Sequence, residues 1–196
     1  LGRNEPFSIS HERIYQHIRR DRDRGGRLHT HLRQQQHPKR ISSKTAYKGS
    51  IPHRISIDDR PAIVDEKTQI GDWEVDLMMG GHGGGGLLTL LDRKTRFIRI
   101  EPVLSKHADH VADVIIGVLS DIKGQVHTLT MDNGNEFAQH ERVAKALQAK
   151  VYFAHPYCAW ERGANENTNG LLRQYFPKGT NFKLLSQAKV RRAENR

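Results

Sequence analysis

Three acidic residues occupy positions where their side chains could do chemistry together. Asp76 lies inside a run with strand-like alternation, Asp132 directly follows a second apolar run, and Glu166 falls in the first turn of a predicted helix. Because catalytic groups in α/β proteins gather where central strands end, we expect the three carboxylates to converge. An all-oxygen site without thiolates favours Mg²⁺ or Mn²⁺. Two such ions, about 3.5–4 Å apart, could activate a water or hydroxyl and stabilise the leaving oxygen of a phosphodiester.

The residues alone leave a structural explanation open for each carboxylate. Asp72, Glu74 and Asp76 alternate along one predicted strand, so any of them could be a solvated charge at a sheet edge. The sequence Asp-Asn-Gly at 132–134 is a common turn sequence. Glu166 could simply complement the dipole at the start of its helix.

Around these residues the hydrophobic pattern predicts an α/β domain with a mixed five-stranded sheet flanked by helices. Alternating or short apolar runs predict strands, and apolar residues at i, i+3, i+4 and i+7 predict helices. The predicted strands are 73–78, 87–91, 97–100, 126–131 and 151–153, and the predicted helices are 105–121, 141–149 and 163–175. Six glycines within 80–86 predict a flexible connection between the first two strands.

The positive charge of the chain is concentrated near its N-terminus. The 196 residues include 32 Lys or Arg and 22 Asp or Glu, a formal net charge of +10, and residues 1–60 hold 14 of the basic and 6 of the acidic residues. The apolar spacing in residues 10–20 predicts a short helix that Ser10 caps. Residues 21–60 have almost no apolar periodicity, which predicts a linker or a basic arm. Such an arm could neutralise nucleic-acid phosphates, or it could be a solvated tail.

Composition disfavours several classes of protein. No apolar run approaches the ~18 residues of a membrane span, and the N-terminus has no signal-peptide pattern. Cys158 is the single cysteine, which excludes an intrachain disulfide and a multi-thiolate metal site. We therefore expect a protein of the cytoplasm that has no membrane partner.

Four sequence blocks together resemble the insertion-sequence 30 family of bacterial transposases. The blocks are GDWEVDLMMG at 71–80, TLLDRKTRF at 89–97, TMDNGNEF at 130–137 and ERGANENTNGLLRQYFPKGTNF at 161–182. The resemblance extends over about residues 7–183. It implies a ribonuclease-H-like integrase core that cleaves DNA and transfers strands at insertion-sequence ends.

The resemblance also implies roles for the acidic residues. It places the family's two aspartates on Asp76 and Asp132 and its glutamate on Glu166, with 33 residues between the last two. These residues would be both the catalytic groups and the ligands of two Mg²⁺ (or Mn²⁺) ions. The implied partners are the terminal inverted repeats and target DNA, bound by a homo-oligomer that is associated with the bacterial nucleoid.

Basic and amide residues near the acidic triad are candidates for accessory roles. On the predicted helix, Asn169 and Arg173 share a face with Glu166, so Arg173 could hold a DNA phosphate. The candidate DNA contacts are Arg162, Arg173 and Lys178, and the candidate supporting residues are Asn133, Asn135 and Asn169. Asn133 and Asn135 could equally be ordinary turn residues.

Compared with the family pattern, the chain is expected to be truncated at both ends. Residues 7–20 resemble only the closing part of a helix-turn-helix region. We therefore assign 1–60 to a remnant of that region with a basic linker, 61–183 to the integrase core and 184–196 to a truncated C-terminal tail. Two alternative functions stay open: a catalytically inactive DNA-binding remnant, and a ribonuclease-H-like nuclease that does not join DNA ends.

Overall fold

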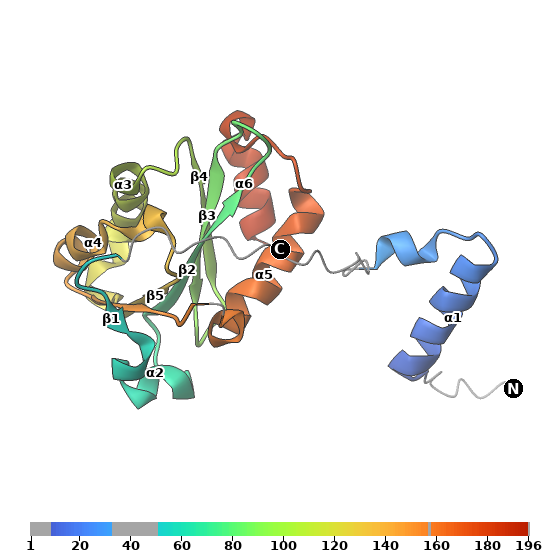
Figure 1. Ribbon diagram of the computed structural model, residues 1–196, viewed down its shortest axis with the longest axis horizontal. Coiled ribbons are helices and arrows are strands. Elements are labelled where there is room, and N and C mark those ends of the chain that lie inside the picture. Colours follow the sequence, from blue (N-terminus) through green and yellow to red (C-terminus); the bar gives the residue numbers. More distant parts are fainter. Residues whose placement is uncertain (1–8, 33–50, 157, 196) are drawn as a thin grey trace, which may run out of the picture. The chain divides into compact units, whose positions relative to one another are not determined.

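The computed structural model describes residues 9–32, 51–156 and 158–195, and the chain divides into two compact units. The first unit spans 1–45 and the second spans 46–196. Figure 1 shows both units, of which the second contains the sheet.

The first unit contains the short helix that the sequence predicts. Helix α1 (His11–Asp23) starts after Ser10, whose hydroxyl accepts a hydrogen bond from the Arg13 amide at 3.4 Å. A single 3₁₀ turn follows at Leu28–His31. Neither element has a buried residue, so the described part of this unit has no hydrophobic core of its own. The rest of the predicted arm, 33–50, lies outside the described residues.

The second unit is built on one mixed sheet, which confirms the predicted fold class. In spatial order the strands run β1-β6-β5-β2-β3-β4. Their bounds are β1 (Ile55–Ser56), β2 (Asp72–Met79), β3 (Gly86–Asp92), β4 (Ile98–Val103), β5 (Thr128–Met131) and β6 (Lys150–Phe153). The pairs β1–β6, β6–β5 and β5–β2 are parallel, whereas β2, β3 and β4 form an antiparallel meander.

The predicted number of five strands was one too low. The additional strand, β1, has only two residues and pairs in parallel with Tyr152 and Phe153 of β6. A two-residue strand has no periodicity to detect, because its pairing is decided by a partner almost a hundred residues away in sequence.

Helices cover both faces of the sheet (Figure 1), with α3 and α4 on one face and α5 and α6 on the other. Their bounds are α3 (Ala108–Leu119), α4 (His140–Leu147), α5 (Gly163–Tyr175) and α6 (Gln187–Glu194), and α2 (Ala62–Glu66) precedes β2. The range of α5 is the predicted one. Helix α3 is shorter than predicted: it begins after His107, whose backbone is extended, and from Ser120 to Gln125 the chain continues as a 3₁₀ segment. Among the described residues, no helix is long and apolar enough to cross a membrane.

Two hydrophobic clusters, one on each face, hold these layers together. On the first face, Leu88 and Leu90 of β3 pack with α3 and α4. On the second, Leu87 of β3 packs with Leu172 of α5 and Val190 of α6. Adjacent residues of β3 thus point to opposite clusters, as the alternation of a strand requires, and the whole strand is buried.

Helix α6 belongs to this packed unit. Its Val190 and Ala193 are buried, and the Glu194 carboxylate accepts a hydrogen bond from the Ile100 amide of β4 at 3.0 Å. The compact unit therefore includes residues 184–196, and also 51–60, where Ile57 is buried. The functional assignment of the three predicted segments stays a prediction.

The glycine-rich connection between β2 and β3 is packed rather than loose. Gly81 donates to the Thr180 carbonyl at 3.1 Å, and Phe182 donates back to the Gly84 carbonyl at 2.8 Å. At Gly85, φ is +69°, and a Cβ would lie 2.5 Å from the Val103 carbonyl oxygen. Glycine is needed at Gly85 because the backbone of β4 lies directly against it.

We expect Gly85→Ala to destabilise the fold more than Gly83→Ala. Both positions have positive φ, which costs an alanine about 1–2 kcal/mol. Only Gly85 faces a backbone carbonyl, since a Cβ at Gly83 has open space, and overpacking adds about 1–3 kcal/mol. The free energies of unfolding of both variants, measured in urea, test this. Equal losses would show that the loop is not tightly packed.

Candidate active site

The two aspartates of the predicted triad lie on neighbouring parallel strands. In the register of β2 and β5, Glu74 is opposite Thr130. Asp76 and Asp132 each follow two residues later, so both lie toward the carboxyl ends of their strands. The predicted convergence of these two carboxylates thus follows from strand pairing.

One arginine contacts both aspartates. Arg162, the residue that precedes α5, places Nη1 at 3.2 Å from Asp76 Oδ1 and Nη2 at 3.3 Å from Asp132 Oδ2. The side chain of Arg162 is 13% exposed, so this contact is largely shielded from solvent. The guanidinium therefore lies between the two carboxylates.

Each aspartate has one further hydrogen-bond donor. Asn169 Nδ2 of α5 donates to Asp76 Oδ2 at 2.5 Å, and the Gly134 amide donates to Asp132 Oδ1 at 2.9 Å. Burial raises the pKa of the Asp132 carboxyl, and the nearby charge of Asp76 adds to the rise. The Arg162 guanidinium and the Gly134 amide act the other way and lower that pKa, but the net shift is upward. A second cation at this position would favour the charged form of Asp132 further.

Glu166 does not join this pair in the structure. It is exposed, and among the described residues it forms no hydrogen bond or ion pair with another side chain. Its place in α5, four residues after Arg162 and three before Asn169, puts it on the helix face that carries the two residues contacting Asp76. Within the described residues, no three His, Cys, Asp or Glu side chains are grouped as a metal site. The role of Glu166 stays a prediction.

The other two acidic residues of β2 are buried, so they are not solvated edge charges. Asp72 accepts hydrogen bonds from Thr128 Oγ1 at 2.7 Å and from Gln69 Nε2 at 2.8 Å. Glu74 is 2% exposed and forms an ion pair with Arg93 at 2.8 Å. Both carboxylates have partners other than the aspartate pair.

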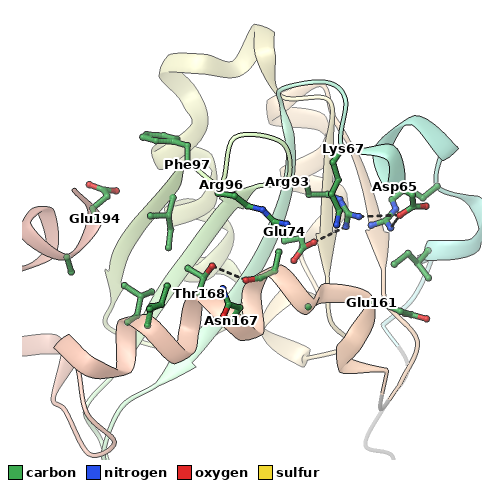
Figure 2. Close-up of a pocket in the computed structure, with 18 of the residues that line it drawn as sticks. Asp65, Lys67, Glu74, Arg93, Arg96, Phe97, Glu161, Asn167, Thr168 and Glu194 are labelled. Carbon is green, nitrogen blue, oxygen red and sulfur yellow. Dashed lines mark hydrogen bonds and ion pairs between the residues drawn. The ribbon is translucent and has the colours of Figure 1, made fainter. Parts of the chain in front are cut away.

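Glu74 also connects the sheet to the helix above it. Its Oε2 accepts a hydrogen bond from the backbone amide of Asn165, in the first turn of α5, at 3.1 Å. Arg93, its ion-pair partner, comes from the turn between β3 and β4 and also donates to the Val64 carbonyl at 3.1 Å. Figure 2 shows Glu74 and Arg93 pointing toward each other beside α5, with Asp65 on the far side of the guanidinium. This buried carboxylate fixes the start of the helix that carries Asn169 and directly follows Arg162.

The same contacts border an open groove of about 1080 Å³. Its walls include Glu74, Arg93, Phe97, Asn167 and Tyr175, and Asp76 and Asp132 are not among its lining residues (Figure 2). The groove and the aspartate pair are therefore separate features of the molecule.

Comparison with known proteins identifies the fold and the family. The model of the integrase core domain matches residues 66–159. The transposase of insertion sequence element IS4351 from Bacteroides fragilis is 46% identical over 190 residues, which cover 96% of this chain and 58% of the relative. These matches show that the chain is similar to transposases of insertion sequences, that of IS30A among them.

Two further relatives agree with this similarity. The transposase of IS1086 from Cupriavidus metallidurans is 35% identical over 94% of this chain and 56% of its own length. Transposase InsI of IS30A from Escherichia coli is 33% identical over 91% of this chain and 48% of its own length. The chain thus spans about half the length of the curated relatives that it matches.

A solved structure supports the integrase-type, ribonuclease-H-like fold. The simian T-cell lymphotropic virus intasome, determined in complex with PP2A regulatory subunit B56 gamma, contains a chain that superposes with a TM-score of 0.52. The match covers 64% of this chain and 47% of that one, at 18% identity. At this identity the likeness concerns the fold.

In the described part of the chain, the remaining predicted site residues form no hydrogen bond or ion pair with the aspartate pair. Arg173 donates to the Met79 carbonyl at 3.1 Å, and burial lowers the pKa of its guanidinium. Lys178 is exposed just beyond α5. Asn133 donates to the Ala154 carbonyl at 2.5 Å and accepts a hydrogen bond from Arg54, while Asn135 is exposed. Their assignments as DNA-binding and supporting residues stay predictions.

Sequence reasoning missed two features near the aspartates. Glu136 is half-buried, and burial raises the pKa of its carboxyl, with further increases from the charges of Asp132 and Asp76. Its carboxyl group lies over Gly134, within 2.5–2.7 Å of where a Cβ would be. The second missed feature is the Glu74–Arg93 pair. Both partners lie in the family-like sequence blocks, which is the only signal that could have indicated them.

We expect Glu74→Gln to lower the free energy of unfolding by about 3–5 kcal/mol, because Arg93 would lose its buried counter-charge. Asp113→Asn, which removes the partner of Arg142 in an exposed ion pair, is the matched control and should cost less than about 1 kcal/mol. Denaturant unfolding of both variants measures the difference. Similar losses would contradict the positioning role of Glu74.

His155 should make stability depend on pH. Its ring nitrogens contact Glu161 Oε1 at 2.8 Å and Asp58 Oδ2 at 2.9 Å, and these hydrogen bonds, that of Glu161 first, raise its pKa above the ordinary 6.5. Since the folded pKa is raised, the stabilisation is complete below about pH 6.5 and is lost as the pH rises through the raised value.

The stability difference between the wild type and His155→Gln should therefore shrink between pH 6 and pH 8.5. Unfolding midpoints measured across this range test the expectation, with His82→Gln in the β2–β3 loop as the control. A difference that stays constant with pH would show that His155 is not charged in these contacts.

Proposed function

We propose that this chain catalyses metal-dependent DNA cleavage and strand transfer at the ends of an insertion sequence. The observation that carries the proposal is the placement of Asp76 and Asp132 on adjacent parallel strands, where one guanidinium contacts both carboxylates. The family of the chain and its integrase-type fold support the same chemistry.

The donor set fits a divalent cation of the hard class. Two carboxylates from the neighbouring central strands β2 and β5 already accept a cationic partner. Oxygen ligands are those that Mg²⁺ and Mn²⁺ prefer. Asp76 and Asp132, together with Glu166, would hold the ions, of which we expect two. When bound, such ions lower the pKa of an attacking water or hydroxyl and stabilise the leaving oxygen of the phosphodiester.

The residues of the chain itself would position the reacting groups. Asn169 fixes one oxygen of Asp76, and the Gly134 amide fixes one oxygen of Asp132, so the remaining oxygens are those that face Arg162. Exposed Glu166 would approach from α5, which Glu74 holds in place. Lys178 is free to contact a DNA phosphate, and Arg162 and Arg173 are further candidates.

The proposed partners are the terminal inverted repeats and target DNA, bound by a homo-oligomer on the DNA of the bacterial nucleoid. The basic residues of the first compact unit would bind phosphates along the duplex without reading its sequence. The second unit would carry the reaction. Bacterial relatives named as transposases support this assignment.

We expect Asp132→Asn to abolish DNA nicking, with a loss of at least about 100-fold, while DNA binding stays equal or becomes slightly stronger. The amide is a poorer ligand for a hard cation, and one negative charge near the phosphates is removed. The measurement uses the full chain, a labelled duplex with the inverted repeat of its element, supercoiled plasmid as target, and Mg²⁺ or Mn²⁺. Asp113→Asn serves as the folded control.

The products of this assay separate the candidate functions. Joined strands with the wild type, and none with Asp132→Asn, support the proposal. Cleavage without joining would indicate a nuclease of another kind, and DNA binding without cleavage would indicate a non-catalytic remnant. Full nicking by Asp132→Asn would contradict the assignment of Asp132.

A further inference from the structure

Arg162 occupies the place that a bound cation would take between the two aspartates. Its Nη1 and Nη2 each contact a different carboxylate, at 3.2 Å on Asp76 and 3.3 Å on Asp132. Among the described residues, no other Lys or Arg forms an ion pair with either aspartate, and Arg173 of α5 donates to the Met79 carbonyl instead. Among the described residues, Arg162 is thus the cation that both carboxylates share.

Without Arg162, little positive charge would offset the repulsion between the two aspartates. Besides Asp76 and Asp132, the charged group nearby is Glu136, whose carboxyl feels the charges of both aspartates. Lys106 acts on Glu136 rather than on the pair. Asn169 and the Gly134 amide donate hydrogen bonds but carry no charge. Close carboxylates repel when no cation lies between them, so the guanidinium holds them together.

The resting position of Arg162 leaves one of its donors unsatisfied. Among the described residues, its buried Nε has no hydrogen-bond partner. A buried donor without a partner is unfavourable, and movement of the side chain toward solvent or a phosphate would relieve this. Nη1 also donates to the Val75 carbonyl at 3.5 Å, so among the described residues Arg162 is held between the aspartates with one buried donor left unpaired.

We propose that Arg162 is an internal counter-cation that competes with the divalent ion for Asp76 and Asp132. It holds the carboxylates in register when no divalent ion is bound, and it leaves when one enters, because two cations cannot share the same carboxylate oxygens without strong repulsion. Arg162 is thus a positioning residue that sets metal affinity. This inference rests on the proposed function, since it concerns the metal site of that reaction.

The test measures Mn²⁺ binding without DNA. Titration calorimetry and the electron paramagnetic resonance signal of free Mn²⁺ give the dissociation constant of the full chain. Arg162→Ala should bind Mn²⁺ about tenfold more tightly than the wild type, and Arg162→Lys, which keeps the charge, should stay close to the wild type. Arg173→Ala removes a positive charge from the same helix without touching the aspartates, and its affinity should change less than twofold.

Thermal unfolding provides a second measurement for the same variants. Arg162→Ala should unfold at a lower temperature than the wild type without Mn²⁺, because the aspartates then repel each other. It should gain more from added Mn²⁺ than the wild type gains. The double variant with Asp132→Asn and Arg162→Ala should show neither the tighter binding of Mn²⁺ nor the larger stabilisation by Mn²⁺, since one carboxylate of the pair is absent.

The outcomes separate the inference from the proposed function. If the wild type binds Mn²⁺ and folded Arg162→Ala binds it equally or more weakly, the counter-cation role is overturned and the proposed function stands. If Arg162→Ala does not fold, Arg162→Gln takes its place in the same comparison. If neither the wild type nor the variants bind Mn²⁺ at millimolar concentration, the metal site of the proposed function is overturned as well.

Discussion

The buried carboxylate of Glu74 is the contact on which the rest of the site depends. It joins β2 to the turn after β3 through Arg93, and to the first turn of α5 through the amide of Asn165. A buried charge is stable only when paired and hydrogen-bonded. The three segments must therefore keep their positions for the ion pair to persist. Because α5 carries Glu166, this one interaction sets where the third carboxylate of the proposed site can lie.

The acidic residues of β2 show how one strand face serves two purposes. Asp72 and Glu74 are buried and have partners within the fold, whereas the side chain of Asp76, nearer the carboxyl end, is 23% exposed. Parallel pairing with β5 brings Asp132 to the same edge. The first two acidic residues of β2 thus serve the fold, and the third, Asp76, is available for chemistry.

Charge balance explains why the site has this form. Two nearby carboxylates require a positive partner, and Arg162, the residue that precedes α5, supplies it. Glu166 is exposed in this arrangement. The integrase-type fold thus brings together two of the three predicted carboxylates, and the third lies on the adjacent face of a helix that is already anchored to the sheet.

The sequence by itself determined the α/β class, the range of α5 and the strands that carry Asp76 and precede Asp132, because these depend on local periodicity and turn residues. It also indicated the family, through blocks of residues that are close together in the chain. Only the tertiary structure decided that β1 adds a sixth strand, that the glycine-rich loop packs against the chain beyond α5, and that Glu74 is buried while Arg162 lies between the aspartates. Each of these depends on contacts between residues far apart in sequence. The same Glu or Arg is stable on a solvated surface or in a buried ion pair, and only its three-dimensional neighbours decide between the two.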